Sequence, residues 1–86
     1  MTNRLLLIDD DARLTALVGD YLRRNGFDIE AAGTLAAGRE RLRHGHYDAL
    51  LLDLMLPDGD GLELTRELRA DPRTRRLPLL MLTARG

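Results

Sequence analysis

Hydrophobic residues in this chain of 86 residues fall into short continuous runs and into longer stretches with helical spacing. The continuous runs are typical of strands buried on both faces of a parallel sheet. They predict strands at Arg4–Ile8, at residues 48–53 and at residues 78–82. A further strand is predicted over residues 27–31, where apolar and acidic residues alternate. That alternation indicates one solvent-facing side, near the edge of the sheet.

Two amphipathic helices are predicted in the first half of the chain. The first begins at Ala12 and ends at Asn25-Gly26, residues that tolerate the positive φ common after helices. Its apolar stripe consists of Leu14, Leu17, Val18, Tyr21 and Leu22. The second helix, residues 35–43, follows Thr34 as N-cap. Its apolar stripe is thin and Gly38 lies within it, so we expect this helix to be weakly packed.

A third helix is predicted between Asp60, which can act as its N-cap, and Ala70. Leu64 and Leu68 would form its buried face, and the Asp-Pro pair that follows disfavours further helical geometry. Strands and helices therefore alternate along the chain. With connections of this length, the alternation predicts right-handed crossovers and an α/β fold with a parallel sheet.

Acidic residues follow two of the predicted strands, at the edge where open α/β sheets carry their chemistry. Asp9 and Asp10 end the first strand, Asp53 ends the third, and Thr83 ends the last. Three carboxylates at one point repel one another, and a hard divalent cation such as Mg²⁺ is the ordinary remedy. An aspartate can also attack phosphorus to form an acyl phosphate. Thr83 could then offer its hydroxyl to a phosphoryl oxygen.

The segment LLDLMLPDGDGL, residues 50–61, is the most informative stretch, because a buried strand changes there into a polar turn. Each candidate residue has a simpler alternative. Asp9 and Asp10 could be solvated loop acids that cap the first helix, Asp53 could be an ordinary acid at a strand end, and Thr83 an ordinary strand-terminal residue. The joint occurrence of all four favours a site.

Other polar residues are interpreted as structural. Asp11 supplies the negative charge favoured at a helix N-terminus, with a direct role at the site as the alternative. His44 and His46 are expected to be exposed rather than to bind a metal, and the arginines of residues 73–76 to form a solvated loop rather than an anion site.

Length, charge and cysteine content exclude several classes of protein and of site. The chain is long enough for one small domain, and its net charge of -1 gives no reason to expect nucleic acid or an anionic membrane as a partner. The absence of cysteine excludes disulfides, thiolate metal sites and a cysteine nucleophile. No signal peptide or membrane span is evident, so a cytoplasmic protein is expected. All 13 basic residues are arginine.

Three separated segments, LLLIDDD, LLLDLMLPDGDGLEL and LPLLMLTARG, together resemble the receiver domain of bacterial two-component response regulators, in particular the OmpR-type winged-helix class. The resemblance covers essentially the whole chain. It implies a flavodoxin-like (CheY-like) doubly wound parallel sheet that is incomplete, with four strands in the order 2-1-3-4 and three helices. Residues 1–86 would form a single receiver domain, truncated on its C-terminal side.

The resemblance also implies a role for each site residue. Asp53 would be the phosphoacceptor and a ligand of Mg²⁺, and Asp10 would be a second direct ligand. The backbone carbonyl of Met55 would be a third ligand, and Asp9 would reach the ion through water.

The hydroxyl of Thr83 and the backbone of Ala84 would contact the phosphoryl group when the domain switches on. The implied function is acceptance of a phosphoryl group from a sensor histidine kinase, normally to regulate transcription. Such a domain assists its own phosphotransfer and is not otherwise an enzyme. No contact with nucleic acid or membrane is expected from this segment.

The sequence departs from the family after the fourth predicted strand. Receivers of this kind continue with a helix, a strand that ends in a phosphate-binding lysine, and a final helix, and this chain contains no lysine. We therefore expect a fragment of a longer regulator, with a genuine minimal protein as the alternative. The strand of residues 78–82, apolar on both faces, would be an exposed edge, which favours a homodimer or a strand-exchanged oligomer. The alternative function is a non-switching module that binds itself, a kinase or a full-length regulator through this strand. A phosphatase is disfavoured because Met55 stands where such enzymes have a second acid.

Overall fold

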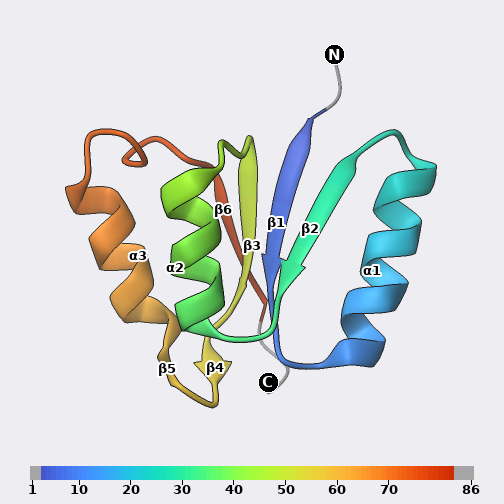
Figure 1. Ribbon diagram of the computed structural model, residues 1–86, viewed down its shortest axis with the longest axis horizontal. Coiled ribbons are helices and arrows are strands. Elements are labelled where there is room, and N and C mark those ends of the chain that lie inside the picture. Colours follow the sequence, from blue (N-terminus) through green and yellow to red (C-terminus); the bar gives the residue numbers. More distant parts are fainter. Residues whose placement is uncertain (1–2, 83–86) are drawn as a thin grey trace.

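The computed structural model of the protein describes residues 3–82. Strands and helices alternate along these residues, as Figure 1 shows. The elements are β1 (Arg4–Ile8), α1 (Ala12–Arg24), β2 (Asp28–Ala32), α2 (Leu35–His44), β3 (Ala49–Asp53), β4 (Met55–Leu56), β5 (Gly59–Asp60), α3 (Gly61–Ala70) and β6 (Leu79–Leu82).

The four longer strands form one parallel sheet in the order β2-β1-β3-β6. This confirms the predicted order, with β6 as the fourth strand. Because the order reverses at β1, the chain crosses to one side of β1 for β2 and to the other for β3. The register pairs Ile8 with Ala32 and with Leu52, so the carboxyl ends of β1, β2 and β3 lie level with one another.

Helices cover the two faces of the sheet unequally (Figure 1). Helices α2 and α3 lie side by side on one face, and α1 lies on the opposite face. The face under α2 and α3 holds the larger core, whose fully buried members include Leu6, Ile8, Leu50, Leu52 and Leu64. The face under α1 holds a smaller core around Leu5, Leu7 and Ile29.

Helix α1 begins and ends as predicted. The Asp11 side chain accepts hydrogen bonds from the backbone N–H groups of the first turn, and Gly26, two residues after the helix, has φ of 90°. The sheet covers only part of the predicted apolar stripe, because Leu17 is 70% exposed and Tyr21 is 66% exposed. Both lie outside the contact that α1 makes with the sheet through Val18 and Leu22.

Helix α2 packs more closely than predicted. Leu35 and Leu42 are buried, and Gly38 is buried between them. The expectation of weak packing treated Gly38 as a gap in the apolar stripe. Its missing side chain instead allows the helix backbone to approach Ile8 of β1 directly.

Strand β2 is shifted by one residue from the predicted range of 27–31. Ala31, predicted to face the core, is exposed, whereas Ala32 is buried and joins the core under α2. The alternation rule failed because both faces of β2 pack against a helix, with Ile29 toward α1 and Ala32 toward α2. The predicted edge position of this strand is confirmed.

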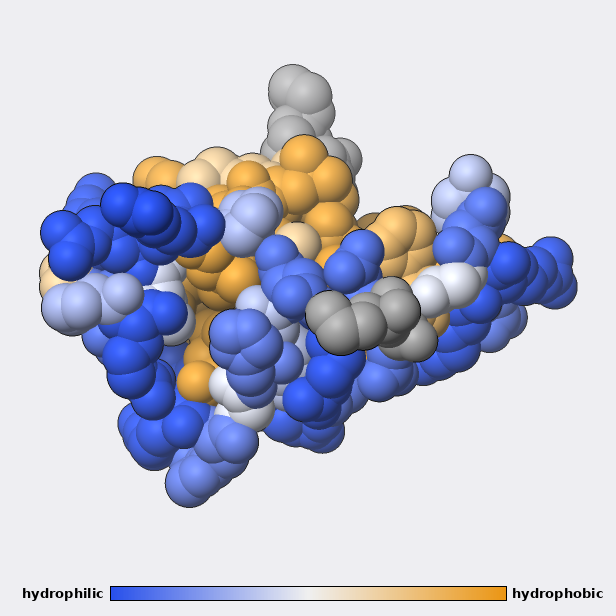
Figure 2. Space-filling view, turned by 90° about the horizontal axis from the view of Figure 1, so that it is seen from above, coloured by the Kyte–Doolittle hydropathy of each residue, from blue (hydrophilic) through white to orange (hydrophobic). Residues whose placement is uncertain are grey.

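Strand β6 lies at the other end of the sheet order and has partly exposed side chains. Leu80 is 60% exposed and Met81 is 40% exposed. Figure 2 shows hydrophobic residues gathered on one side of the molecule between hydrophilic flanks. The described residues therefore present the apolar edge that the sequence predicted. No helix within residues 3–82 has the length and hydrophobicity needed to cross a membrane.

Candidate metal centre

Three carboxylates meet at the carboxyl edge of the sheet. Asp9 and Asp10 directly follow β1, and Asp53 is the last residue of β3, the neighbouring strand. One carboxylate oxygen from each residue lies within 4.8 Å of the others. The predicted convergence of these three acids is therefore confirmed.

Two of the three carboxylates are withdrawn from solvent. Asp9 is 7% exposed and Asp53 is 8% exposed, whereas Asp10 is exposed. Burial raises the pKa of the Asp9 carboxyl, and the negative charges of Asp53 and Asp10 act in the same direction, against a hydrogen bond from the Asp11 backbone. Carboxylates held together in this way are stabilised by a cation.

Backbone hydrogen bonds orient the two buried carboxylates. Asp9 Oδ1 accepts a bond of 2.9 Å from Asp11 N, and Asp53 Oδ1 accepts one of 3.1 Å from Met55 N. Each bond reaches forward two residues into the loop that follows the strand. The side chains are therefore fixed by the same loops that surround the site.

A short hairpin forms one wall of the site. Residues 55–60, predicted to be a turn without regular structure, form two-residue strands β4 and β5 that pair antiparallel. The hairpin and Asp10 line a hollow of about 540 Å³ beside the acidic cluster. Such a hollow has room for a small anionic group next to a cation. Oxygen ligands of this kind suit Mg²⁺, and the three carboxylates fit that ion.

Gly61 determines how the hairpin returns to the sheet. A Cβ atom at Gly61 would lie 2.9 Å from the carbonyl oxygen of Asp53 and 3.0 Å from Cα of Leu54. Its N–H donates to the carbonyl oxygen of Leu54 at 3.1 Å. The start of α3 therefore crosses directly against the end of β3. From its sequence position, Gly61 is interpreted only as a turn-forming residue, because this close approach depends on tertiary structure.

Asp58 also has a role that sequence reasoning did not assign. Its carboxylate accepts hydrogen bonds from Leu35 N and Ala36 N at the start of α2, and these bonds lower its pKa. The contact joins residues 22 and 23 positions apart. No local sequence signal could reveal it.

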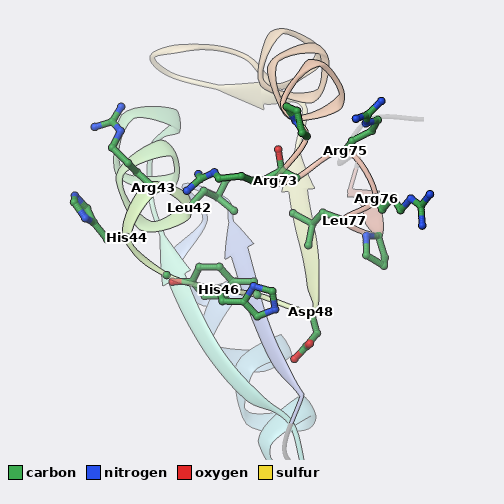
Figure 3. Close-up of a pocket in the computed structure, with 14 residues that line it drawn as sticks. Leu42, Arg43, His44, His46, Asp48, Arg73, Arg75, Arg76 and Leu77 are labelled. Atoms are coloured by element: carbon green, nitrogen blue, oxygen red, sulfur yellow. The ribbon is translucent and has the colours of Figure 1, made fainter.

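A larger groove, of about 980 Å³, lies at the opposite, amino-terminal edge of the sheet (Figure 3). In Figure 3 the side chains of Arg43 and His44 point outward on one side, and those of Arg75 and Arg76 point outward on the other. Glu40 pairs with Arg43 at 2.8 Å and with His44 at 2.9 Å. These four side chains therefore face solvent instead of converging on a ligand, and Arg73 alone of the labelled arginines points across the groove.

The other predicted residues are the two histidines, Asp11 and the two residues after β6. His44 and His46 are exposed, as predicted, and Asp11 caps α1 through hydrogen bonds to Arg13 N and Leu14 N. Thr83 and Ala84 lie outside the described residues.

A parallel sheet with carboxylates at the point where its strand order reverses defines a doubly wound α/β protein with a site at that edge. A sequence model of the response regulator receiver domain matches residues 5–86. The chain belongs to this family.

Two curated relatives illustrate the similarity. Protein PetR of Rhodobacter capsulatus is 44% identical over 82 residues, which cover 95% of this chain and 33% of PetR. Transcriptional regulatory protein SrrA of Staphylococcus aureus is 38% identical over 86 residues, which cover 100% of this chain and 34% of SrrA. The chain thus spans about a third of the length of these relatives.

Solved structures have the same fold. A putative response regulator from Chloroflexus aurantiacus matches with a TM-score of 0.94 at 34% identity, covering 100% of this chain and 70% of the other. The response regulator TrrA from Thermotoga maritima, in complex with Mg²⁺ and BeF, matches with a TM-score of 0.90 at 27% identity, covering 99% and 72%. The predicted CheY-like α/β fold is therefore confirmed.

Proposed function

We propose that this domain accepts a phosphoryl group on Asp53 from a sensor histidine kinase, with Mg²⁺ as cofactor. The observation that carries the proposal is the meeting of Asp9, Asp10 and Asp53 at the carboxyl edge of β1 and β3. Membership of the receiver family supports it, as does the Mg²⁺ and BeF complex of the related TrrA.

The proposed roles follow the positions of the residues. Asp10 and Asp53 would bind Mg²⁺ directly, Asp9 would bind it through water, and Met55 would contribute its backbone carbonyl. When bound, the ion neutralises charge on the transferring phosphoryl group. Thr83 and the Ala84 backbone would contact that group.

In the transfer itself, a carboxylate oxygen of Asp53 forms the new bond to phosphorus as the bond from phosphorus to the kinase histidine breaks. The imidazole leaves and takes up a proton from solvent. The burial of Asp53 limits the access of water to the acyl phosphate that results. The hydrogen bond from Met55 N to Oδ1 holds the carboxylate in one orientation.

The test uses acetyl phosphate as donor in the presence of Mg²⁺. The protein is expected to gain about 80 Da in a bond stable to acid and cleaved by hydroxylamine, as for an acyl phosphate. Asp53→Asn should abolish the gain, and labelling that persists in this variant would overturn the assignment. Omission of Mg²⁺ is the matched control.

We propose further that the domain is part of a longer transcriptional regulator of the OmpR-type class that acts in the cytoplasm, without other enzymatic activity. Support comes from SrrA, a transcriptional regulatory protein about three times as long as this chain. Sequencing of the coding DNA beyond Gly86 tests this proposal. An open frame that encodes a lysine-proline pair and a winged helix is expected, and an immediate stop codon counts against it.

A second candidate function is a non-switching interaction module that pairs through β6. The observation in its favour is the apolar side chains of this strand, with Leu80 at 60% exposure. A module of this kind would self-associate whether or not Asp53 is phosphorylated. Light scattering during size-exclusion chromatography, with and without acetyl phosphate, distinguishes it from the first candidate.

A further inference from the structure

The Asp58 side chain joins the β4–β5 hairpin to the beginning of α2 through hydrogen bonds. Asp58 Oδ1 accepts a hydrogen bond of 2.9 Å from Leu35 N, and its Oδ2 accepts one of 3.0 Å from Ala36 N. Both donors belong to the first turn of α2, where backbone N–H groups have no partner within the helix. The carboxylate therefore joins the hairpin to α2, two segments that are remote in sequence and adjacent in space.

Helix α2 already has a local cap. Thr34, its N-cap residue, accepts a hydrogen bond of 3.1 Å from Ala37 N through Oγ1. The two bonds to Asp58 are additional to this cap, and they differ from it in joining the helix to the hairpin. Loss of the Thr34 hydroxyl removes a bond within the helix end alone, whereas loss of the Asp58 carboxylate removes the two hydrogen bonds that join the hairpin to the helix.

The hairpin has close contacts with both α2 and the acidic site. Leu56 is buried in the same core as Leu35, and a Cβ atom on Gly59 would lie 2.8 Å from Leu35 Cδ1. At its other end, the N–H of Met55 donates to Asp53 Oδ1. A shift of the hairpin away from α2 therefore moves Met55 relative to the Asp53 carboxylate.

We propose that Asp58 is a positioning residue for the metal centre. Its carboxylate holds the hairpin against α2, and the hairpin in turn holds Met55 beside Asp53. The inference rests on the proposed function only in taking Mg²⁺ as the ion. It adds a residue that touches neither the ion nor the phosphoryl group.

This arrangement couples the metal centre to the start of α2. The hydrogen bonds of Asp58 to α2 are proposed to strengthen Mg²⁺ binding. Because coupling free energies are reciprocal, bound Mg²⁺ must then stabilise these hydrogen bonds by the same amount. Mg²⁺ should therefore slow hydrogen exchange at the amides of Leu35 and Ala36. This effect should disappear when the Asp58 carboxylate is removed.

The experiment compares wild type with Asp58→Ala, Asp58→Asn and Thr34→Ala, the last as a matched control at the same helix end. Mg²⁺ affinity is measured by isothermal titration calorimetry, and amide exchange by NMR. We expect Asp58→Ala to weaken Mg²⁺ binding about three- to tenfold, less than the loss of a partner bonded directly to a ligand. Asp58→Asn, which keeps one acceptor oxygen, should fall between this variant and wild type. Thr34→Ala should stay within about twofold of wild type.

Several outcomes would overturn the inference. The first is a folded Asp58→Ala variant with unchanged affinity for Mg²⁺. The second is an equal loss of Mg²⁺ affinity in Thr34→Ala. The third is that Mg²⁺ still slows amide hydrogen exchange at Leu35 and Ala36 in Asp58→Ala. Should Asp58→Ala fail to fold, the Asn variant decides by the same measurements. Failure of wild type to bind Mg²⁺ overturns both proposals. Mg²⁺ binding without labelling of Asp53 by acetyl phosphate overturns only the proposed function.

Discussion

Gly38 of α2 lies directly against Ile8 of β1. A Cβ atom on Gly38 would be 2.3 Å from Ile8 Cδ1 and 2.9 Å from its Cγ1, distances too short for carbon atoms. Ile8 is completely buried and is followed immediately by Asp9, so its position also fixes the start of the acidic site. The missing side chain of Gly38 allows α2 to pack onto the centre of the sheet.

Gly38→Ala is therefore expected to destabilise the protein. The added methyl group overpacks the core at a cost of about 1–3 kcal/mol, and the better helix propensity of alanine offsets up to about 1 kcal/mol. We expect a net loss of about 1–2 kcal/mol in the free energy of unfolding, measured by urea denaturation.

Two comparisons test the cause of that loss. Gly33→Ala places a Cβ where nothing lies within 4 Å, and it should change stability by less than about 0.5 kcal/mol. Ile8→Val removes the clashing Cδ1. The double variant Ile8→Val/Gly38→Ala should therefore lose less unfolding free energy than the sum of the losses in the two single variants. Strict additivity would show that the contact is not responsible.

Asp9→Asn tests the repulsion within the acidic cluster. The amide keeps an oxygen that can accept the bond from Asp11 N, and it removes one of three neighbouring negative charges. Without Mg²⁺ the variant is expected to be more stable than wild type at pH 7 by about 1 kcal/mol, as measured by thermal unfolding. Excess Mg²⁺ should stabilise wild type more than the variant, because the ion binds the native acidic site.

Asp20→Asn is the matched control for this comparison. Asp20 is an exposed carboxylate on α1, where it pairs with Arg23 at 3.8 Å. Its removal should leave the Mg²⁺ response unchanged. An equal gain from Mg²⁺ in wild type and Asp9→Asn would contradict a role for Asp9 near the ion.

Glu30 connects β1, β2 and α2 through three partners, Tyr47, Arg4 and Arg41. Hydrogen bonds from Tyr47, from Arg4 and then from Arg41 lower the pKa of Glu30. Because its folded pKa is below the unfolded one, the group contributes stability above about pH 5 that is lost as the pH falls through the folded pKa. Glu30→Gln should therefore lower the free energy of unfolding at pH 7. The fall of this free energy as the pH is lowered from 7 should also be smaller than in wild type, as measured by urea denaturation at several pH values.

Tyr47→Phe separates the largest of these causes from the others. It removes the hydroxyl that donates to Glu30 Oε1 at 2.8 Å and keeps the ring over the Arg4 guanidinium. A loss of about 1 kcal/mol at pH 7 is expected, with a smaller pH dependence than in wild type. Glu40→Gln, which removes an exposed carboxylate on α2, should cost less than about 0.5 kcal/mol. A larger effect of Glu40→Gln than of Glu30→Gln would exclude this account.

The parts of the fold that repeat a local pattern could be predicted from the sequence. The buried runs around Leu6 and Leu50 were identified as parallel strands, and the acids that follow them could be placed together because all carboxyl ends share one edge. The parts that depend on tertiary contacts could not be predicted. The approach of Gly38 to Ile8 and the bonds of Asp58 to α2 join segments that only the folded chain brings together.

Strand β6 forms an apolar edge of the sheet in residues 3–82. It pairs with β3 along one side, lies at the end of the sheet order, and exposes 60% of Leu80. An apolar edge strand offers unpaired backbone groups and a hydrophobic surface to a second chain. A polypeptide of these 86 residues alone is therefore expected to self-associate, with a mass by light scattering that rises with concentration. Leu80→Lys places a charge on that surface and should shift the protein toward monomer, whereas Leu62→Lys, at a 40% exposed position on α3, should not. A wild-type monomer at all concentrations would exclude β6 as a contact between copies of this chain.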